Sequence, residues 1–173
     1  MQNTVSRSSE WTVTIGASIF IAVLFISAYW EADIRWLHFF QAWMYAATMI
    51  LVWKRSRWGY FIGVGAAALW NYSTLFVNTF LKNGLEQAYV LARTGHLPRP
   101  DLLISVPAWL SNLAVIVGCL LVYVRLSDKE WADGPKFVLA TAGTTAYFAL
   151  IVAMFQPRYL GMFRGMLHPH LHL

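Results

Sequence analysis

Charged residues are scarce in this 173-residue chain, in which Asp, Glu, Lys and Arg together make up 12%. A soluble domain carries about a quarter charged residues, because its surface must face water. Hydrophobic residues, in contrast, make up 58% of the chain. This balance excludes an ordinary water-soluble domain and indicates that most of the surface faces lipid.

Cysteine and the common catalytic motifs are also lacking. The one cysteine, Cys119, lies inside an apolar run and can form no intrachain disulfide. The chain contains no G-x-S-x-G, no H-E-x-x-H and no P-loop, and no predicted span carries paired acids. These absences favour a protein without catalytic activity of its own.

Nucleic acid is excluded as a partner despite the formal charge of +5. A nucleic-acid-binding face needs clustered Lys and Arg, whereas here the basic residues are scattered at the ends of apolar segments. The partner that the composition predicts is the lipid bilayer.

Five apolar runs are present instead, and the first three begin with tryptophan. The first, from Trp11 to Trp30, has twenty residues without a charge, enough to cross the ~30 Å hydrocarbon core as a helix. Asp133-Gly134-Pro135 is a typical helix start for the last run. The sequence predicts an all-α integral membrane protein, a single transmembrane domain over residues 1–173. Its five predicted transmembrane helices cover residues 11–30, 36–53, 58–81, 102–124 and 135–156.

Two other stretches are too polar to span. Residues 82–101 begin with apolar residues at helical spacing and then break at Gly95 and at Pro98-Arg99-Pro100. This pattern predicts a short interfacial helix in the third loop, followed by an extended turn. Residues 157–173 are predicted to form a surface-lying or flexible tail.

The Lys54-Arg55-Ser56-Arg57 turn decides the predicted orientation, because Lys and Arg favour the cytoplasmic side of short loops. Residues 31–35, between the first two spans, carry two acids and one base. The sequence therefore predicts a multi-pass protein of the cell membrane, which would be the inner membrane if the chain is bacterial. Its N-terminus is then cytoplasmic and its C-terminus outside.

Small residues recur along two of the predicted helices. Such stripes let helices approach closely, either within one chain or between a chain and a membrane partner such as a second copy. Intrachain packing is the simpler interpretation, and a dimer seam is the alternative. The stripes consist of Gly59, Gly63 and Ala67 in one helix, and of Ala142, Ala146, Ala149 and Ala153 in the other.

Polar side chains inside the predicted spans are the candidate binding residues. Amides and imidazoles are costly in hydrocarbon, so they should face one another or a wet cavity. They either hold the bundle together or form a polar pocket in its outer half. The set comprises His38, Gln41, Asn71, Thr74, Asn78 and Asn112.

Histidines suggest a cofactor in two places. In an extended chain His168, His170 and His172 point the same way, and imidazole is a good ligand for divalent transition metals. His96, on the same predicted side, is a candidate fourth ligand. His38 is a candidate haem ligand, but no second histidine lies at its depth.

Three function classes remain open. The first is a non-enzymatic subunit, accessory factor or binder of a lipid-like small molecule, with its polar face on the non-cytoplasmic side. The second is a small-solute transporter or permeability component that uses the polar pocket. The third is a metal- or haem-binding redox membrane protein.

Overall fold

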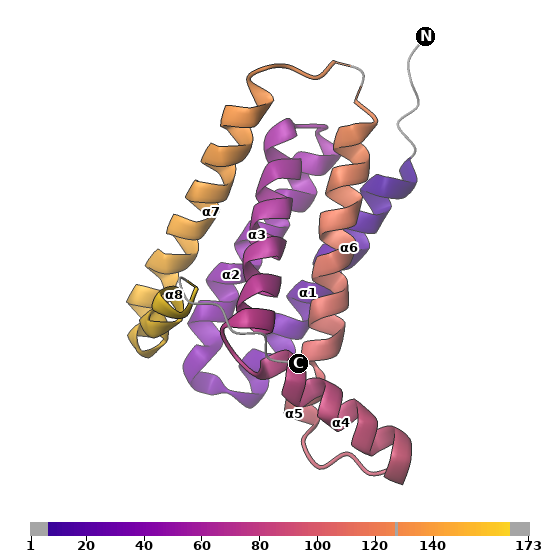
Figure 1. Ribbon diagram of the computed structural model, residues 1–173, viewed down its shortest axis with the longest axis vertical. Coiled ribbons are helices and arrows are strands. Elements are labelled where there is room, and N and C mark those ends of the chain that lie inside the picture. Colours follow the sequence, from indigo (N-terminus) through magenta and orange to yellow (C-terminus); the bar gives the residue numbers. More distant parts are fainter. Residues whose placement is uncertain (1–6, 127, 167–173) are drawn as a thin grey trace.

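The computed structural model describes residues 7–126 and 128–166, and these form helices and no strand. The prediction of an all-α fold is confirmed. Five long helices run along the longest axis of the molecule (Figure 1): α1 (Arg7–Trp30), α2 (Arg35–Trp53), α3 (Arg57–Phe76), α6 (Ser105–Val124) and α7 (Asp133–Phe155). Shorter pieces join or follow them: η1 (Ala32–Ile34), α4 (Phe80–Thr94), α5 (Pro100–Leu103), η2 (Pro157–Leu160) and α8 (Gly161–Gly165).

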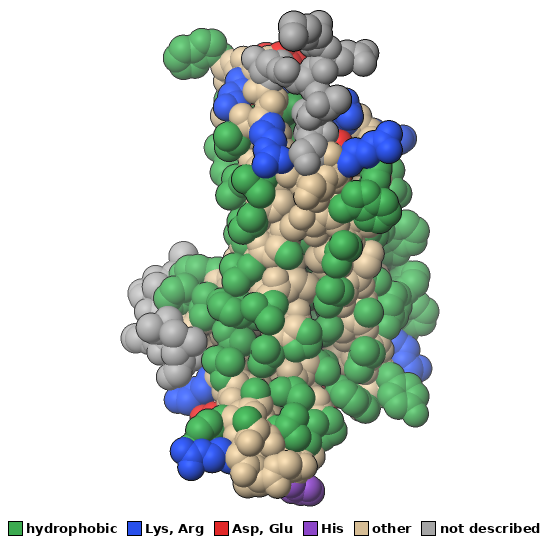
Figure 2. All heavy atoms as spheres, turned by 90° about the vertical axis from the view of Figure 1, so that its right-hand side faces the viewer, with side chains coloured by type: hydrophobic (Ala, Val, Ile, Leu, Met, Phe, Trp, Pro, Cys, Tyr) green, Lys and Arg blue, Asp and Glu red, His purple; other side chains and the backbone are tan. Residues whose placement is uncertain are grey.

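Three helical segments are long and apolar enough to cross a membrane: α1, the α5–α6 segment Pro100–Val124, and α7. A fourth span results if α3 and α4, which are bent by 72° at their junction, count as one. Helix α2 (19 residues), which carries His38 and Gln41, is not among these segments. Figure 2 shows hydrophobic side chains over the middle of one face, and Lys and Arg side chains toward both its upper and its lower end.

The predicted span 58–81 is not one continuous helix, because α3 stops at Phe76. The backbone N–H groups of Val77 and Asn78 both donate to the carbonyl of Ser73, so the regular helical pattern ends there. The side chain of Asn78 then accepts a hydrogen bond of 2.9 Å from the backbone N–H of Phe80. Asparagine often competes with a helix in this way, and the competition explains the sharp bend.

Helix α4 is the short helix that the sequence places in the third loop. It projects sideways from one end of the bundle (Figure 1) and leaves Leu85 and Tyr89 exposed. It ends at Gly95, whose φ of 67° is the left-handed conformation that glycine adopts at helix ends. Its steep angle to α3 is the geometry expected of a helix that lies across the bundle axis.

The two small-residue stripes lie in different environments. A Cβ atom at Gly63 would stand 2.7 Å from both Cys119 Sγ on α6 and Thr48 Cγ2 on α2, and Ala67 is fully buried. The α3 stripe therefore packs inside the chain. On α7, Ala142, Ala146 and Ala153 are exposed and Ala149 is half-buried.

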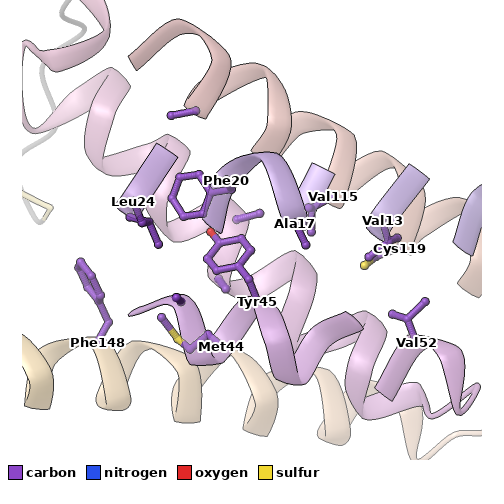
Figure 3. Packing of buried hydrophobic residues seen from close by; sticks show 14 of the residues in the cluster. Val13, Ala17, Phe20, Leu24, Met44, Tyr45, Val52, Val115, Cys119 and Phe148 are labelled. Atoms are coloured by element: carbon purple, nitrogen blue, oxygen red, sulfur yellow. The ribbon is translucent and has the colours of Figure 1, made fainter. Parts of the chain in front are cut away.

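Aromatic and aliphatic side chains fill the middle of the bundle. Figure 3 shows Tyr45 of α2 beside Phe20 of α1, and the centroids of the two rings are 4.4 Å apart. Phe20 also contacts Trp70 of α3, with ring centroids 5.2 Å apart. These three rings join α1, α2 and α3.

Ion pairs tie the helices together at the end of the bundle that carries the α2–α3 turn. The guanidinium of Arg57 lies 2.9 Å from Asp133 Oδ1 and 3.0 Å from Glu130 Oε2, and also contacts Asp128. Arg125 Nη1 donates to Ser9 Oγ over 2.9 Å. The basic turn at residues 54–57 and the acidic segment before α7 therefore partly neutralise each other.

Candidate ligand-binding cavity

A cavity of about 400 Å³ lies between the helices at the end of the bundle opposite the 54–57 turn. Ligand pockets for small molecules commonly fall between about 300 and 1,000 Å³, so the size suits a small organic ligand. Its walls come from α1, η1, α2, α3, α4, α7 and the segment after α7, with Ile104 from the α5–α6 junction. The lining residues are Phe20, Val23, Leu24, Ser27, Glu31, Ile34, Leu37, His38, Gln41, Trp70, Ser73, Thr74, Asn78, Phe80, Ile104, Phe148, Val152, Tyr159 and Met162.

Four of the six predicted pocket residues meet in this lining: His38, Gln41, Thr74 and Asn78. Helix α2 presents His38 and Gln41 one turn apart, since residues three or four apart share one helix face. Helix α3 presents Thr74 in its last turn, and Asn78 follows in the bend between α3 and α4. The antiparallel packing of α2 against α3 brings the two faces together.

His38 is held in place by the backbone of α1. Its Nδ1 lies 3.1 Å from the carbonyl oxygen of Leu24, and His38 is half-buried. The ring therefore spans from α2 to α1, along the wall of the cavity. This contact orients the imidazole. The other ring nitrogen, Nε2, takes no part in it.

The side chains of Ser73, Thr74 and Asn78 in the lining are mostly engaged by the protein itself. Thr74 Oγ1 donates within α3, 3.2 Å from the carbonyl of Trp70 and 3.1 Å from that of Asn71. Ser73 Oγ donates to Leu69, and Asn78 accepts from the start of α4. These side chains make the wall of the cavity locally polar, although part of their hydrogen-bonding capacity is already taken up by the protein.

Asn112 and Asn71 do not line the cavity. The Tyr45 hydroxyl donates to Asn112 Oδ1 over 2.5 Å, and Asn112 Nδ2 donates to the carbonyl of Ala108 over 2.9 Å. Asn112 is fully buried, so its contacts join α6 to α2. Asn71 is buried as well, and neither atom of its amide has a hydrogen-bond partner among the described residues.

The segment that follows α7 covers part of the cavity. Gln156 donates to the backbone carbonyl of Asp33, and Arg158 pairs with the Asp33 carboxylate. These contacts hold the chain so that Tyr159 and Met162 line the cavity. The sequence predicts only a tail over residues 157–173. The opposite charges of Asp33 and Arg158, on the same predicted side, are the sequence signal that could have indicated this contact.

Apolar lining residues such as Phe20, Trp70 and Phe148 were also not predicted. An aromatic residue in an apolar run has the same sequence signature whether it fills the core or lines a cavity. Only the packing of the helices separates the two cases, so no sequence signal could have found them.

A second hollow, an apolar groove of about 490 Å³, runs along α2, α3 and α7. The hydroxyl groups in its lining are engaged, since Thr144 donates to the carbonyl of Ala140 and Tyr147 to that of Phe40. The groove therefore offers a ligand no free polar group from these side chains. It is suited to contact with hydrocarbon chains more than to specific recognition.

The predicted metal site falls largely outside the described residues, because His168, His170 and His172 lie there. His96, its candidate fourth ligand, is exposed in the loop between α4 and α5. Over residues 7–126 and 128–166, no group of three His, Cys, Asp or Glu side chains is placed to hold a metal ion.

Comparison of the chain with known protein families, with curated proteins and with solved structures gives no match.

Proposed function

We propose that this chain is a five-span membrane protein that binds an amphipathic small molecule in the cavity beside His38. One observation carries the proposal: the cavity combines a polar wall containing His38 and Gln41 with an apolar end containing Phe20 and Trp70. A lipid-like molecule with a polar head and a hydrocarbon or ring body matches such a lining. The role is non-enzymatic, as a binder or as a subunit that carries the ligand.

The five-span arrangement and its direction are part of the proposal. Charged ends, tryptophan-rich helix termini and a hydrophobic middle support it, and the 54–57 turn supports a cytoplasmic N-terminus. In this orientation the cavity opens toward the non-cytoplasmic side, and α4 lies at that interface. The exposed alanines of α7 then face lipid or a membrane partner.

Reporter fusions test the arrangement. We expect a reporter inserted after Ser56 to be cytoplasmic, and reporters within residues 96–99 and at the C-terminus to be non-cytoplasmic. The two sides of the membrane are distinguished by comparing the activity of an alkaline phosphatase fusion with the signal of a fluorescent-protein fusion at the same position. Fusions at residue 56 and at the C-terminus that report the same compartment would contradict five spans.

A blocked cavity tests the binding. Ser27 of α1 lines the cavity and is half-buried, so Ser27→Trp should fill it without a large disturbance of the core. A photoreactive alkyl probe in lipid nanodiscs should then label the cavity residues at least about tenfold less, which corresponds to ~1.4 kcal/mol of binding free energy. Labelled positions are mapped by peptide mass spectrometry.

The matched control is Ser18→Trp, on the same helix but exposed. It should leave labelling of the cavity unchanged. Equal labelling of the two variants, or labelling confined to lipid-facing residues in the unmodified protein, would refute the binding function.

A transporter is less well supported by the lining. Among the described lining residues, Phe20, Gln41 and Trp70 lie nearest to the end of the bundle that carries the 54–57 turn. Past that level, Phe20 packs on the fully buried Tyr45. The cavity is therefore closed at its inner end in this conformation, as expected of a binding site.

A further inference from the structure

We infer that the cavity selects a non-anionic amphiphile whose polar end carries an O–H or N–H donor. The inference rests on the proposed binding function and specifies its ligand class. It follows from the tautomer of His38, from the charges around the mouth of the cavity and from the place of the apolar residues.

The tautomer of His38 follows from its partner. A backbone carbonyl oxygen can only accept, so the nitrogen 3.1 Å from Leu24 O, Nδ1, must carry the proton. In the neutral imidazole the other nitrogen, Nε2, is then an acceptor. A ligand that meets Nε2 must therefore supply a donor. A ketone, an ether or an ester has none at that position.

The charge at the mouth of the cavity disfavours an anionic ligand. Among the described residues that line the cavity, Glu31 is the one with a charge, and it is negative. Its carboxylate is a second acceptor and repels a carboxylate or phosphate head.

Two nearby arginines do not offset Glu31, since each is engaged by its own acid. Arg158 pairs with Asp33. Arg99 binds Asp101 through two hydrogen bonds, of 3.0 Å from Nε and 2.6 Å from Nη2. Neither arginine belongs to the lining, so an anionic head would find no free guanidinium there.

The apolar residues determine where the rest of the ligand lies. Glu31, which directly follows α1, marks the mouth, and Phe20, about three turns before the end of α1, marks the inner end. Phe20 and Trp70 offer ring faces and edges to a hydrocarbon body. The donor therefore sits near His38, and the apolar body extends toward the two rings.

Three photoreactive alkyl probes of equal length, ending in a hydroxyl, a methyl ether or a carboxylate, test the selectivity. They are applied to the full chain in nanodiscs, and labelled cavity residues are quantified by peptide mass spectrometry. We expect the hydroxyl probe to label the cavity about fivefold more than the ether, the effect of one net hydrogen bond, and more than the carboxylate. Equal labelling by hydroxyl and ether, or stronger labelling by the carboxylate, overturns the selectivity and leaves the binding function standing.

Substitution of His38 assigns the preference to its acceptor. His38→Phe should reduce the hydroxyl-to-ether ratio to about one, whereas His38→Gln, whose amide oxygen can replace Nε2 as an acceptor, should retain a preference. A ratio unchanged in His38→Phe overturns the role of His38. If that variant does not fold, the three-probe comparison on the unmodified protein still decides the ligand class. Absence of cavity labelling with every probe refutes the proposed function itself.

Discussion

Gly16→Leu is expected to destabilise the bundle more than any other single change considered for this chain. Gly16 lies where α1 packs against α6, and a Cβ atom there would stand 2.8 Å from the backbone oxygen of Ser111. The side chains of Val115 and Ala114 lie at 3.1 and 3.2 Å from the same position. A leucine adds three further carbons, and the backbone oxygen cannot rotate away. We expect a loss of about 3 kcal/mol or more, at the upper end of overpacking costs.

Thermal unfolding in detergent micelles, followed by circular dichroism, measures this loss. The matched control is Gly143→Leu on α7, where nothing lies within 4 Å of the added Cβ. That substitution should be neutral or slightly stabilising, because leucine is a better helix former than glycine by roughly 0.8 kcal/mol. Equal melting temperatures for the two leucine variants would show that α1 and α6 do not pack as the structure places them.

Tyr45→Phe and Asn112→Leu are each expected to cost about 1–3 kcal/mol, because each leaves one buried polar group without its partner. The Tyr45 hydroxyl and Asn112 Oδ1 lie 2.5 Å apart, and both residues are almost completely buried. The same unfolding measurement applies. Neither change should alter labelling of the cavity, since neither residue lines it.

The double variant Tyr45→Phe/Asn112→Leu gives the decisive comparison. Once both partners are removed, no hydroxyl is left unpaired, so the double variant should lose less stability than the sum of the single variants. A coupling of at least about 0.5 kcal/mol is expected for groups in direct contact. Strict additivity would mean that the two side chains do not pair, and that Asn112 is available for another role.

The predicted polar set divides into two groups that the sequence treats alike. Asn112 is a structural residue joined to Tyr45, whereas His38 and Gln41 lie on the wall of the cavity. All three are polar residues in apolar runs. The difference is that Asn112 has a hydrogen-bond partner on another helix, Tyr45. Nothing in the sequence around Tyr45 marks it as that partner.

The sequence by itself determined the helices, because hydrophobic run length and the local chemistry of prolines, glycines and charges act within a few residues. It also placed His38 and Gln41 on one face of α2, since the helical period alone decides which residues share a face. It missed the end of α3, where the side chain of Asn78 binds the backbone of the next helix.

Only the tertiary structure decided which faces meet. The close approach of α1 to α6 at Gly16, and of α3 to α2 and α6 at Gly63, sets the rotation and register of the helices. Those two quantities place Asn112 against Tyr45 and leave His38 beside an open cavity. They depend on contacts between residues far apart in the chain, and for that reason no local pattern could reveal them.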